Sequence, residues 1–393
     1  MDLADDRVTR FAALTGPEGR ALLAELADAR VDDDTALRLS DRLRARFPAA
    51  LVADGLTLQR LRDRAAAKFS RARDMMLTRD GLEQASGEAV ARHRAARLAG
   101  GGPVADLCCG IGGDLVALAA HGPVLGVDRD PLHAWMAEHN AAVYGVAERV
   151  RTEVVDVRAV DLTGVAAVFV DPARRSERGR TRDGEPPLDW CAGLAERVPR
   201  VAVKAAPGLD RAAVPPGWEA EFVAVGTDLK EAVLWSPAAA EVTSRATVLC
   251  DDGRHTLLPA PGAAVAVDEP GEYLLDPNPA VTRAGLVAEL ARATGTWQID
   301  ERIAFLAAAA PLTTPFARTL RVLDSAPWRE KELAARIRAL DVGSVDVRRR
   351  GLAGDVDVLR KRLARALAGG GRRATLVMTR ARDRPWALIC VDA

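Results

Sequence analysis

The chain has 393 residues, of which 49% are hydrophobic and 28% charged, and its 55 basic residues balance its 55 acidic ones. This length and apolar content indicate a soluble globular protein with two or three domains. The even charge excludes a protein whose whole surface binds nucleic acid. No apolar stretch is long enough to span a membrane, and the start lacks a signal-peptide pattern, so we expect a cytoplasmic protein.

Residues 1–98 are predicted to form a helical domain. Apolar residues recur at helical spacing in 21–26 and again in 36–43. Asp33 or Asp34 is expected to cap the second of these helices. A run of three glycines and a proline at 100–103 then separates the helices from the segment that follows.

A basic helical stretch runs from Arg62 to Met76. One interpretation is a substrate-binding helix, in which Lys68 and Arg71 contact the substrate. The other is a solvated helix face. Only five residues of the chain are lysines and 50 are arginines, which weakens any argument from the number of arginines alone.

A glycine-rich turn lies between two apolar runs that each end in an acid. The first run and the turn read Val104-Ala-Asp106-Leu-Cys108-Cys109-Gly110-Ile-Gly112-Gly113-Asp114, and the second run ends at Asp128. This order is typical of a βαβ nucleotide-binding unit. The spacing from Gly110 to Asp128 suits a carboxylate that binds the two hydroxyls of a ribose. Both NAD and S-adenosylmethionine carry such a ribose.

The turn itself favours S-adenosylmethionine. A dinucleotide site needs a third glycine and an uncharged helix start for the pyrophosphate, but Leu115 and Asp114 stand there. S-adenosylmethionine has no phosphate and carries a sulfonium and an ammonium, which Asp106 and Asp114 would attract. A glycine-rich turn is weak support on its own, so the cofactor prediction depends on three further positions.

Those positions follow along the chain. Asp156 closes a short β-like run and could accept a hydrogen bond from the adenine amino group. An apolar run then ends in Asp171 and Pro172, and proline ends a central strand. A fifth strand ends near Lys204. In an open α/β sheet these side chains share the edge at the carboxyl ends of the strands.

These elements predict an α/β fold with a doubly wound, Rossmann-like sheet in residues 99–246. The runs 221–225 and 231–235 are expected to form an antiparallel edge pair. Residues 247–393 are expected to form a C-terminal α/β region. Its last part, from 345 to 380, has a basic β-turn-α-β pattern, which would suit either phosphate binding or an arginine-rich surface.

The tetrapeptide Asp276-Pro277-Asn278-Pro279 mimics a methyltransferase catalytic motif. It lies beyond the fifth strand, so we interpret it as a turn that caps a helix over 282–294. The five cysteines have no metal-ligand spacing, and we expect neither a metal site nor a disulfide framework. A catalytic cysteine at Cys191 remains an alternative, although no local motif supports it.

The segment from Phe69 to Arg174 resembles the catalytic core of trimethylguanosine synthase and its bacterial relatives. The resemblance rests on four motifs: Glu88-Ala-Val-Ala-Arg-His93, Asp106-Leu-Cys-Cys-Gly110-Ile-Gly-Gly113, Gly126-Val-Asp128-Arg-Asp130-Pro131 and His139-Asn140-Ala-Ala-Val-Tyr144-Gly145-Val146. Those enzymes carry a Pro-Pro-Trp whose tryptophan stacks on guanine, whereas this chain has Pro172-Ala173-Arg174. Methylation of an RNA cap is therefore not expected.

The whole chain resembles an actinobacterial-type family of class I methyltransferases with a THUMP-like C-terminal domain. The matching segments are Asp171-Pro172-Ala173-Arg174-Arg175 and Leu229-Lys230-Glu231-Ala232-Val233-Leu234-Trp235. THUMP domains belong to RNA-modifying enzymes, so the resemblance implies RNA as the partner. The expected activity is methylation of a base nitrogen in tRNA or rRNA. The alternatives are a methyltransferase of proteins or small metabolites, and a non-catalytic RNA-binding protein.

Each predicted site residue has an expected role. Asp171 would hydrogen-bond an exocyclic amino group or a ring nitrogen, Pro172 would offer a backbone carbonyl, and Arg174 would stack on the base. The predicted cofactor-binding residues are Asp106, Cys108, Gly110, Gly112, Gly113, Asp128, Arg129, Asp156 and Asp171. The predicted substrate-binding residues are Lys68, Arg71, Arg175 and Lys204, with Arg178, Arg180 and Arg182 on the same loop as Arg175.

Overall fold

The computed structural model describes residues 5–27, 29, 31–176, 179–367 and 371–393, without the side chains of 33, 174–176 and 179–183. Contacts divide the chain into two compact units, Met1–Glu219 with Val233–Glu241, and Ala220–Ala232 with Val242–Ala393. The predicted boundaries at 98/99 and 246/247 stay a prediction. No helix within the described ranges is long and apolar enough to cross a membrane.

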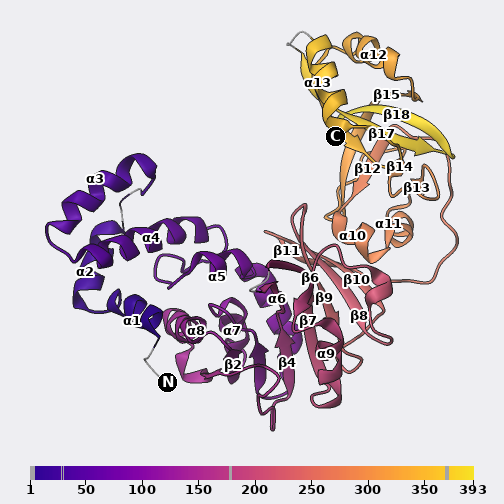
Figure 1. Ribbon diagram of the computed structural model, residues 1–393. Coiled ribbons are helices and arrows are strands. Elements are labelled where there is room, and N and C mark those ends of the chain that lie inside the picture. Colours follow the sequence, from indigo (N-terminus) through magenta and orange to yellow (C-terminus); the bar gives the residue numbers. More distant parts are fainter. Residues whose placement is uncertain (1–4, 28, 30, 177–178, 368–370) are drawn as a thin grey trace. The chain divides into compact units, whose positions relative to one another are not determined.

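The first unit begins with helices, as predicted (Figure 1). They are α1 (Asp6–Ala13), α2 (Pro17–Leu26), α3 (Asp33–Arg44), α4 (Ala49–Ala65), α5 (Arg79–Gln84) and α6 (Glu88–Leu98). Asp32, rather than Asp33 or Asp34, caps α3, because its carboxylate and the hydroxyl of Thr35 bond each other's backbone amides. Buried residues of these helices form one hydrophobic core with Ile111 of the glycine turn and Met136.

The central sheet is built from short buried strands. Its strands in this unit are β1 (Val104–Leu107), β2 (Val124–Asp128), β3 (Val150–Val154), β4 (Ala167–Val170) and β7 (Arg200–Ala205). Their order is β7-β4-β1-β2-β3, and all four neighbouring pairs are parallel. The strand order reverses direction between β1 and β4, and ligands of open α/β sheets bind at such a switch point.

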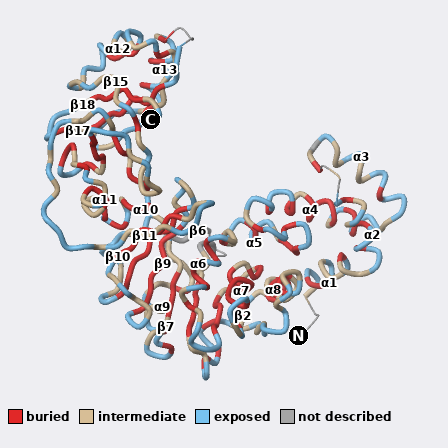
Figure 2. The backbone as a smooth tube through the Cα atoms, turned by 180° about the vertical axis from the view of Figure 1, so that it is seen from behind, coloured by how far each residue is buried: buried red, intermediate tan, exposed pale blue. Residues whose placement is uncertain are grey.

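Helices connect these parallel strands. The main ones are α7 (Gly113–Ala119), α8 (Pro131–Val143) and α9 (Leu188–Gly193). Helices α7 and α8 lie side by side next to β2 (Figure 1), and α9 contacts β7. Most of α7 is buried, as the red tube in Figure 2 shows. The apolar runs predicted the βαβ order because parallel strands buried on both faces are apolar throughout.

Two further strands follow in the sheet, β8 (Glu219–Val225) and β9 (Asp228–Trp235). They are neighbours, as predicted, but they are not at the edge. In the strand order β10 (Ser244–Cys250) and β11 (Gly253–Leu257) lie beyond β8. Strand β10 pairs with β8 in parallel, and no strand was predicted at 244–250.

The second unit contains a separate seven-stranded sheet. Its order is β13-β14-β12-β15-β18-β17-β16, from β12 (Tyr273–Pro277), β13 (Trp297–Gln298), β14 (Leu306–Ala308), β15 (Ala317–Pro327), β16 (Val342–Arg349), β17 (Arg372–Ala381) and β18 (Arg384–Asp392). Strand β16 pairs with β17 in parallel across helix α13 (Val356–Ala366), which confirms the predicted β-turn-α-β pattern. A hydrophobic core of this unit includes Leu333 and Ile337 of α12 (Leu333–Ala339) together with residues of β17.

The tetrapeptide at 276–279 ends β12 and starts a helix. Asn278 caps α10 (Pro279–Ala284), so the interpretation as a capping turn is confirmed. The predicted single helix over 282–294 is wrong. Gly285 adopts a left-handed conformation with φ of 73° and ends α10, and α11 (Val287–Thr294) follows.

Candidate active site at the switch point

The glycine turn that follows β1 contains several residues in the left-handed backbone conformation. Cys108, Gly110 and Gly112 have φ values of 63°, 52° and 83°. A Cβ on Gly112 would lie 2.9 Å from the Cα of Ala137, so this position requires glycine for space as well as for conformation. The turn therefore brings the start of α7 close to α8. Gly113 then begins α7.

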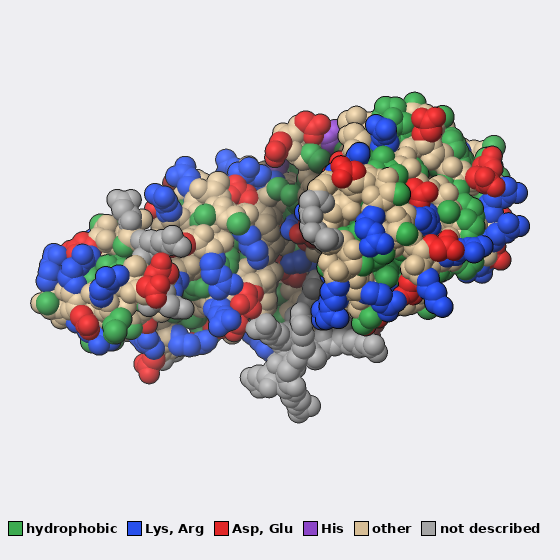
Figure 3. Space-filling model, turned by 90° about the horizontal axis from the view of Figure 1, so that it is seen from above, with side chains coloured by type: hydrophobic (Ala, Val, Ile, Leu, Met, Phe, Trp, Pro, Cys, Tyr) green, Lys and Arg blue, Asp and Glu red, His purple; other side chains and the backbone are tan. Residues whose placement is uncertain are grey.

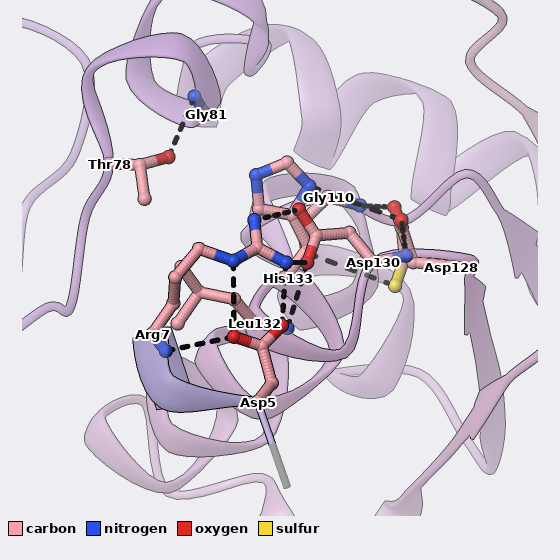
Figure 4. Close-up of polar contacts among 10 residues, drawn as sticks. Asp5, Arg7, Thr78, Gly81, Gly110, Asp128, Asp130, Leu132 and His133 are labelled. Carbon is pink, nitrogen blue, oxygen red and sulfur yellow. Dashed lines mark hydrogen bonds and ion pairs between the residues drawn. The ribbon is translucent and has the colours of Figure 1, made fainter. Parts of the chain in front are cut away.

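Asp128, at the end of β2, is hydrogen-bonded to the turn (Figure 4). One carboxylate oxygen accepts from the amide of Gly110 at 2.9 Å, and the other accepts from the amide of Asp130 at 2.9 Å. A carboxylate has about four acceptor positions, so each oxygen can still accept a hydroxyl. This geometry agrees with the predicted ribose contact. Arg129, the next residue, is exposed.

An N-terminal residue reaches the same edge. Arg7 forms a two-pronged ion pair with Asp130, with contacts of 3.1 and 2.9 Å, and it also pairs with Asp5 (Figure 4). Asp130 in turn caps α8 through the amide of Leu132. Nothing in the local sequence pattern around Arg7 indicated this contact, which joins residues 123 positions apart.

Asp106 is the most unusual side chain of the site. It is 1% exposed, and neither carboxylate oxygen has a hydrogen-bond partner in the part of the chain that the structure describes. Burial raises the pKa of Asp106 well above its ordinary value, and the nearby carboxylates of Asp114 and Asp171 raise it further. A buried carboxyl group without a donor is costly, which indicates that a ligand completes this site.

Asp114 has a cation of its own. The buried guanidinium of Arg94, on α6, pairs with the Asp114 carboxylate and lies 4.8 Å from the ring centre of Phe169. Sequence reasoning counted Asp114 among the acids that attract the cofactor and missed Arg94. Arg94 also attracts Asp106, at the end of β1, but it forms its hydrogen bonds with Asp114. Asp106 is therefore left without a hydrogen-bond partner among the described side chains.

Asp171 follows β4 and lies opposite the end of β1, because its amide donates to the carbonyl of Leu107 at 3.2 Å. The ammonium of Lys204, at the end of β7, contacts one Asp171 carboxylate oxygen at 2.7 Å. The structure thus brings two predicted site residues together, although they were assigned to different roles. Pro172 follows, and a Cβ on Gly184 would come within 2.6 Å of its ring.

Asp156 lies two residues beyond the end of β3 and its side chain is 50% exposed. Its carboxylate accepts from the amide of Arg158 at 2.8 Å and leaves acceptor positions open to solvent.

The two cysteines near the site are not activated as thiolates. Cys108 is half-buried, and burial raises its thiol pKa well above the ordinary value. Cys191 is fully buried, and burial raises its pKa to about 12, which argues against a thiolate nucleophile there.

The predicted substrate residues divide into three groups. The ammonium of Lys68 donates to the carbonyls of Leu82 and Ala85, at 2.7 and 3.0 Å, so it is engaged with the end of α5. Arg71 is exposed. The backbone around Arg174 and Arg175 forms the hairpin of β5 (Ala173–Ser176) and β6 (Gly179–Glu185). The side chains of Arg174, Arg175, Arg180 and Arg182, and all of Arg178, lie outside the described residues.

Asn140 is a supporting residue that sequence reasoning quoted only as part of a motif. It is fully buried on α8, its Nδ2 donates to the carbonyls of Met76 and Ile111, and its Oδ1 accepts from the amide of Met76. A polar residue within an otherwise apolar helix face was the available signal. Asn140 thereby joins the N-terminal helices to the glycine turn.

We expect Asn140→Ala to lower the free energy of unfolding by about 2–4 kcal/mol, because three buried backbone groups lose their partners. Urea unfolding followed by circular dichroism measures this change. The equally buried Thr247, whose hydroxyl bonds Glu221, lies in the other unit, so Thr247→Val serves as a control for loss of a buried polar group away from the turn. An unchanged unfolding midpoint for Asn140→Ala would contradict the role given to Asn140.

Comparison with known proteins identifies the family. An uncharacterised S-adenosylmethionine-dependent methyltransferase of Mycobacterium tuberculosis, found in strains CDC 1551 and H37Rv, is 36% identical over 346 residues, which cover 81% of this chain and 90% of the relative. This chain belongs to the S-adenosylmethionine-dependent methyltransferases. Residues 102–177 of the methyltransferase match the RNA cap guanine-N2 methyltransferase family, 317–391 match a THUMP-like domain, and 6–65 match a domain of unknown function.

A solved structure supports the fold. A protein assigned as a methyltransferase from Porphyromonas gingivalis W83 aligns with a TM-score of 0.71 at 19% identity, over 92% of this methyltransferase and 98% of that chain. Together with the curated relative and the family matches, this fold confirms the resemblance to class I methyltransferases with a THUMP-like domain. Among the described side chains, no group of three or more His, Cys, Asp or Glu is arranged to hold a metal ion.

The residues at the switch point fit S-adenosylmethionine. The unpartnered Asp106 carboxyl suits a cationic group of the cofactor, and Asp128 retains acceptor positions for the ribose hydroxyls. Asp156 would bind the adenine amino group. The cofactor supplies an activated methyl group as an electrophile. The chain itself therefore has to orient the acceptor and receive its proton.

Proposed function

We propose that this methyltransferase transfers a methyl group to a base nitrogen in RNA, in tRNA or rRNA. The observation that carries the proposal is the position of Asp171. Its carboxylate follows β4 at the switch point, close enough to Asp106 to raise the pKa of that acid, and one of its oxygens is held by Lys204. The other oxygen has no donor among the described side chains, and we propose that it accepts a hydrogen bond from an N–H group of a base.

Two features support RNA as the substrate class. The matched families are an RNA cap guanine-N2 methyltransferase over the core and a THUMP-like domain near the C-terminus. Cap methylation itself is not proposed, because Ala173 and Arg174 replace the residues that stack the cap guanine in trimethylguanosine synthase. We propose that Arg174 stacks on the target base and that Arg175 and Arg71 lie along the path of the RNA. Lys68 is not included, because its ammonium binds the carbonyls of Leu82 and Ala85.

Charge on the surface is mixed rather than uniformly basic. In the face that Figure 3 shows, lysine and arginine side chains are interspersed with aspartate and glutamate. In the seven-stranded sheet of the second unit, Arg373 pairs with Asp346, and Arg318 pairs with Asp392. Recognition of RNA would therefore rely on local contacts near the site, with a modest salt dependence of binding.

A methyl-transfer assay tests this proposal. The protein is incubated with S-adenosylmethionine carrying a tritiated methyl group and with total RNA, total protein or a small-molecule extract from a strain that lacks the gene. We expect label in the RNA fraction, lost after ribonuclease treatment. Label only in protein or only in the small-molecule fraction would contradict the proposal and favour the corresponding alternative substrate.

A further inference from the structure

Lys204 has two partners at the switch point. Its side chain is 10% exposed, and its Nζ lies 2.7 Å from Asp171 Oδ2 and 3.4 Å from the carbonyl oxygen of Gln84. No donor from a described side chain contacts Asp171 Oδ1. The ammonium therefore holds one carboxylate oxygen of Asp171, and the other oxygen has no donor among the described side chains.

The second partner of Lys204 belongs to helix α5. Gln84 is the last residue of α5, and the carbonyls of Leu82 and Ala85 at the same helix end bind Lys68. Cations are favoured at the carboxyl end of a helix. Helix α5 also packs on the glycine turn, since a Cβ on Gly81 would lie 2.4 Å from Ile111. Lys204 thus joins Asp171 to a helix that contacts the cofactor-binding turn.

The residue type at 204 is informative in this chain, which has five lysines and 50 arginines. Two of the five lysines bind the end of α5. A lysine ammonium is a compact point charge with three donors, whereas a guanidinium is planar and needs more room. The site between Asp171 and α5 therefore suits lysine, despite the general preference for arginine in this chain.

The balance of charges around Asp106 also indicates a role for the Lys204 ammonium. Asp114 and Asp171 both lie near Asp106, and each has a cation of its own, Arg94 for Asp114 and Lys204 for Asp171. Without Lys204, the Asp171 carboxylate would lie near Asp106 with no compensating charge among the described side chains. Repulsion would then favour a rotamer of Asp171 directed away from the site.

We propose that Lys204 is a positioning residue that holds Asp171 Oδ2 and so directs Oδ1 toward the N–H group of the methyl acceptor. This inference rests on the proposed function, because it takes Asp171 as the group that binds the acceptor. It replaces the direct contact with substrate that we predicted for Lys204. The ammonium is engaged with Asp171 and α5, and it acts on the acceptor only through Asp171.

Steady-state kinetics with RNA from the strain that lacks the gene tests this role. We expect Lys204→Met to lower kcat about 100-fold with a KM for RNA within threefold of wild type, since misplacing a reacting group has an effect of about this size. In an Asp171→Asn background the same substitution should change kcat less than threefold. Lys204→Arg should keep kcat at least tenfold above Lys204→Met, because a cation remains.

A second measurement does not depend on activity. Thermal unfolding of the cofactor-free protein should show a lower Tm for Lys204→Met and for Asp171→Asn alone, and no further loss when the two are combined. If Lys204→Met does not fold, Lys204→Gln replaces it. Lys230→Met is the matched control, because Lys230 pairs with Asp228 on the surface, and its kcat and Tm should stay at wild-type values.

Three results would overturn the inference. A raised KM for RNA with unchanged kcat in Lys204→Met would mean that Lys204 contacts the substrate directly. Wild-type kcat and KM in this variant would mean that Lys204 has no role in transfer. Additive losses of Tm in the double variant would mean that the two side chains act independently. A wild-type kcat in Asp171→Asn would remove the premise that Asp171 binds the acceptor. Failure of the proposed function is seen separately, as absence of methyl transfer to RNA by the wild-type protein.

Discussion

Asp171→Asn is expected to lower kcat about 1,000-fold while the affinity for S-adenosylmethionine stays within threefold of wild type. The amide of asparagine keeps the size of the side chain but presents a donor where the acceptor nitrogen needs a hydrogen-bond acceptor. It also loses the ion pair with Lys204. Single-turnover kinetics with RNA measures the transfer step, and calorimetry measures the binding of the cofactor.

The control for this prediction is Asp189→Asn. Asp189 lies in the first turn of α9, and its carboxylate accepts only from the neighbouring amide of Trp190 among the hydrogen bonds of the described chain. This variant should keep the wild-type rate of transfer. A loss of cofactor affinity in Asp171→Asn equal to its loss of rate would mean that Asp171 serves cofactor binding, and the account of Asp171 as the acceptor-binding group would be wrong.

Asp106→Asn is expected to weaken S-adenosylmethionine binding about 100-fold and yet to stabilise the cofactor-free protein by about 1 kcal/mol. Burial raises the pKa of Asp106 in the folded protein, so folding favours the protonated acid. That contribution to stability is full below the unfolded pKa, near 4, and is lost as pH rises through the folded value. The stability advantage of the Asp106→Asn variant over wild type should therefore grow as pH increases.

Thermal unfolding of both cofactor-free proteins between pH 5 and pH 9 measures the stability difference, and calorimetry gives the affinities. Asp114→Asn is the matched control, since it removes a neighbouring carboxylate that is paired. It should destabilise the protein by about 3 kcal/mol because it removes the negative charge that compensates the buried Arg94. An Asp106→Asn variant that is less stable than wild type at every pH would show that the carboxyl has a partner in the free protein.

The elements of the core could be predicted because each obeys a local rule. The buried runs before Asp106 and Asp128, the left-handed turn at Gly112, and the strand end at Pro172 are each encoded within a few residues. Parallel strands then bring Asp106 and Asp171 to one edge of the sheet. The cofactor and the family could be inferred from the same residues.

The contacts that complete the site depend on residues far apart in the chain. Arg94 and Asp114 are 20 positions apart, Lys204 and Asp171 are 33 apart, and Arg7 and Asp130 are 123 apart. No spacing rule connects such pairs, so arginine and lysine could not be assigned to partners before the fold was known. The cap at Asp32 was missed for a different reason, since three adjacent aspartates have the same capping propensity. The end of α10 had a local signal, Gly285, which the prediction of one helix over 282–294 passed over.

The central claim is that this methyltransferase modifies a base nitrogen in RNA. Mass spectrometry of nucleosides from tRNA and rRNA tests it directly in a strain that lacks the gene. We predict the loss of one N-methylated nucleoside, restored by the wild-type gene and not by a gene that encodes Asp171→Asn. An unchanged set of methylated nucleosides in both RNA classes would contradict the claim.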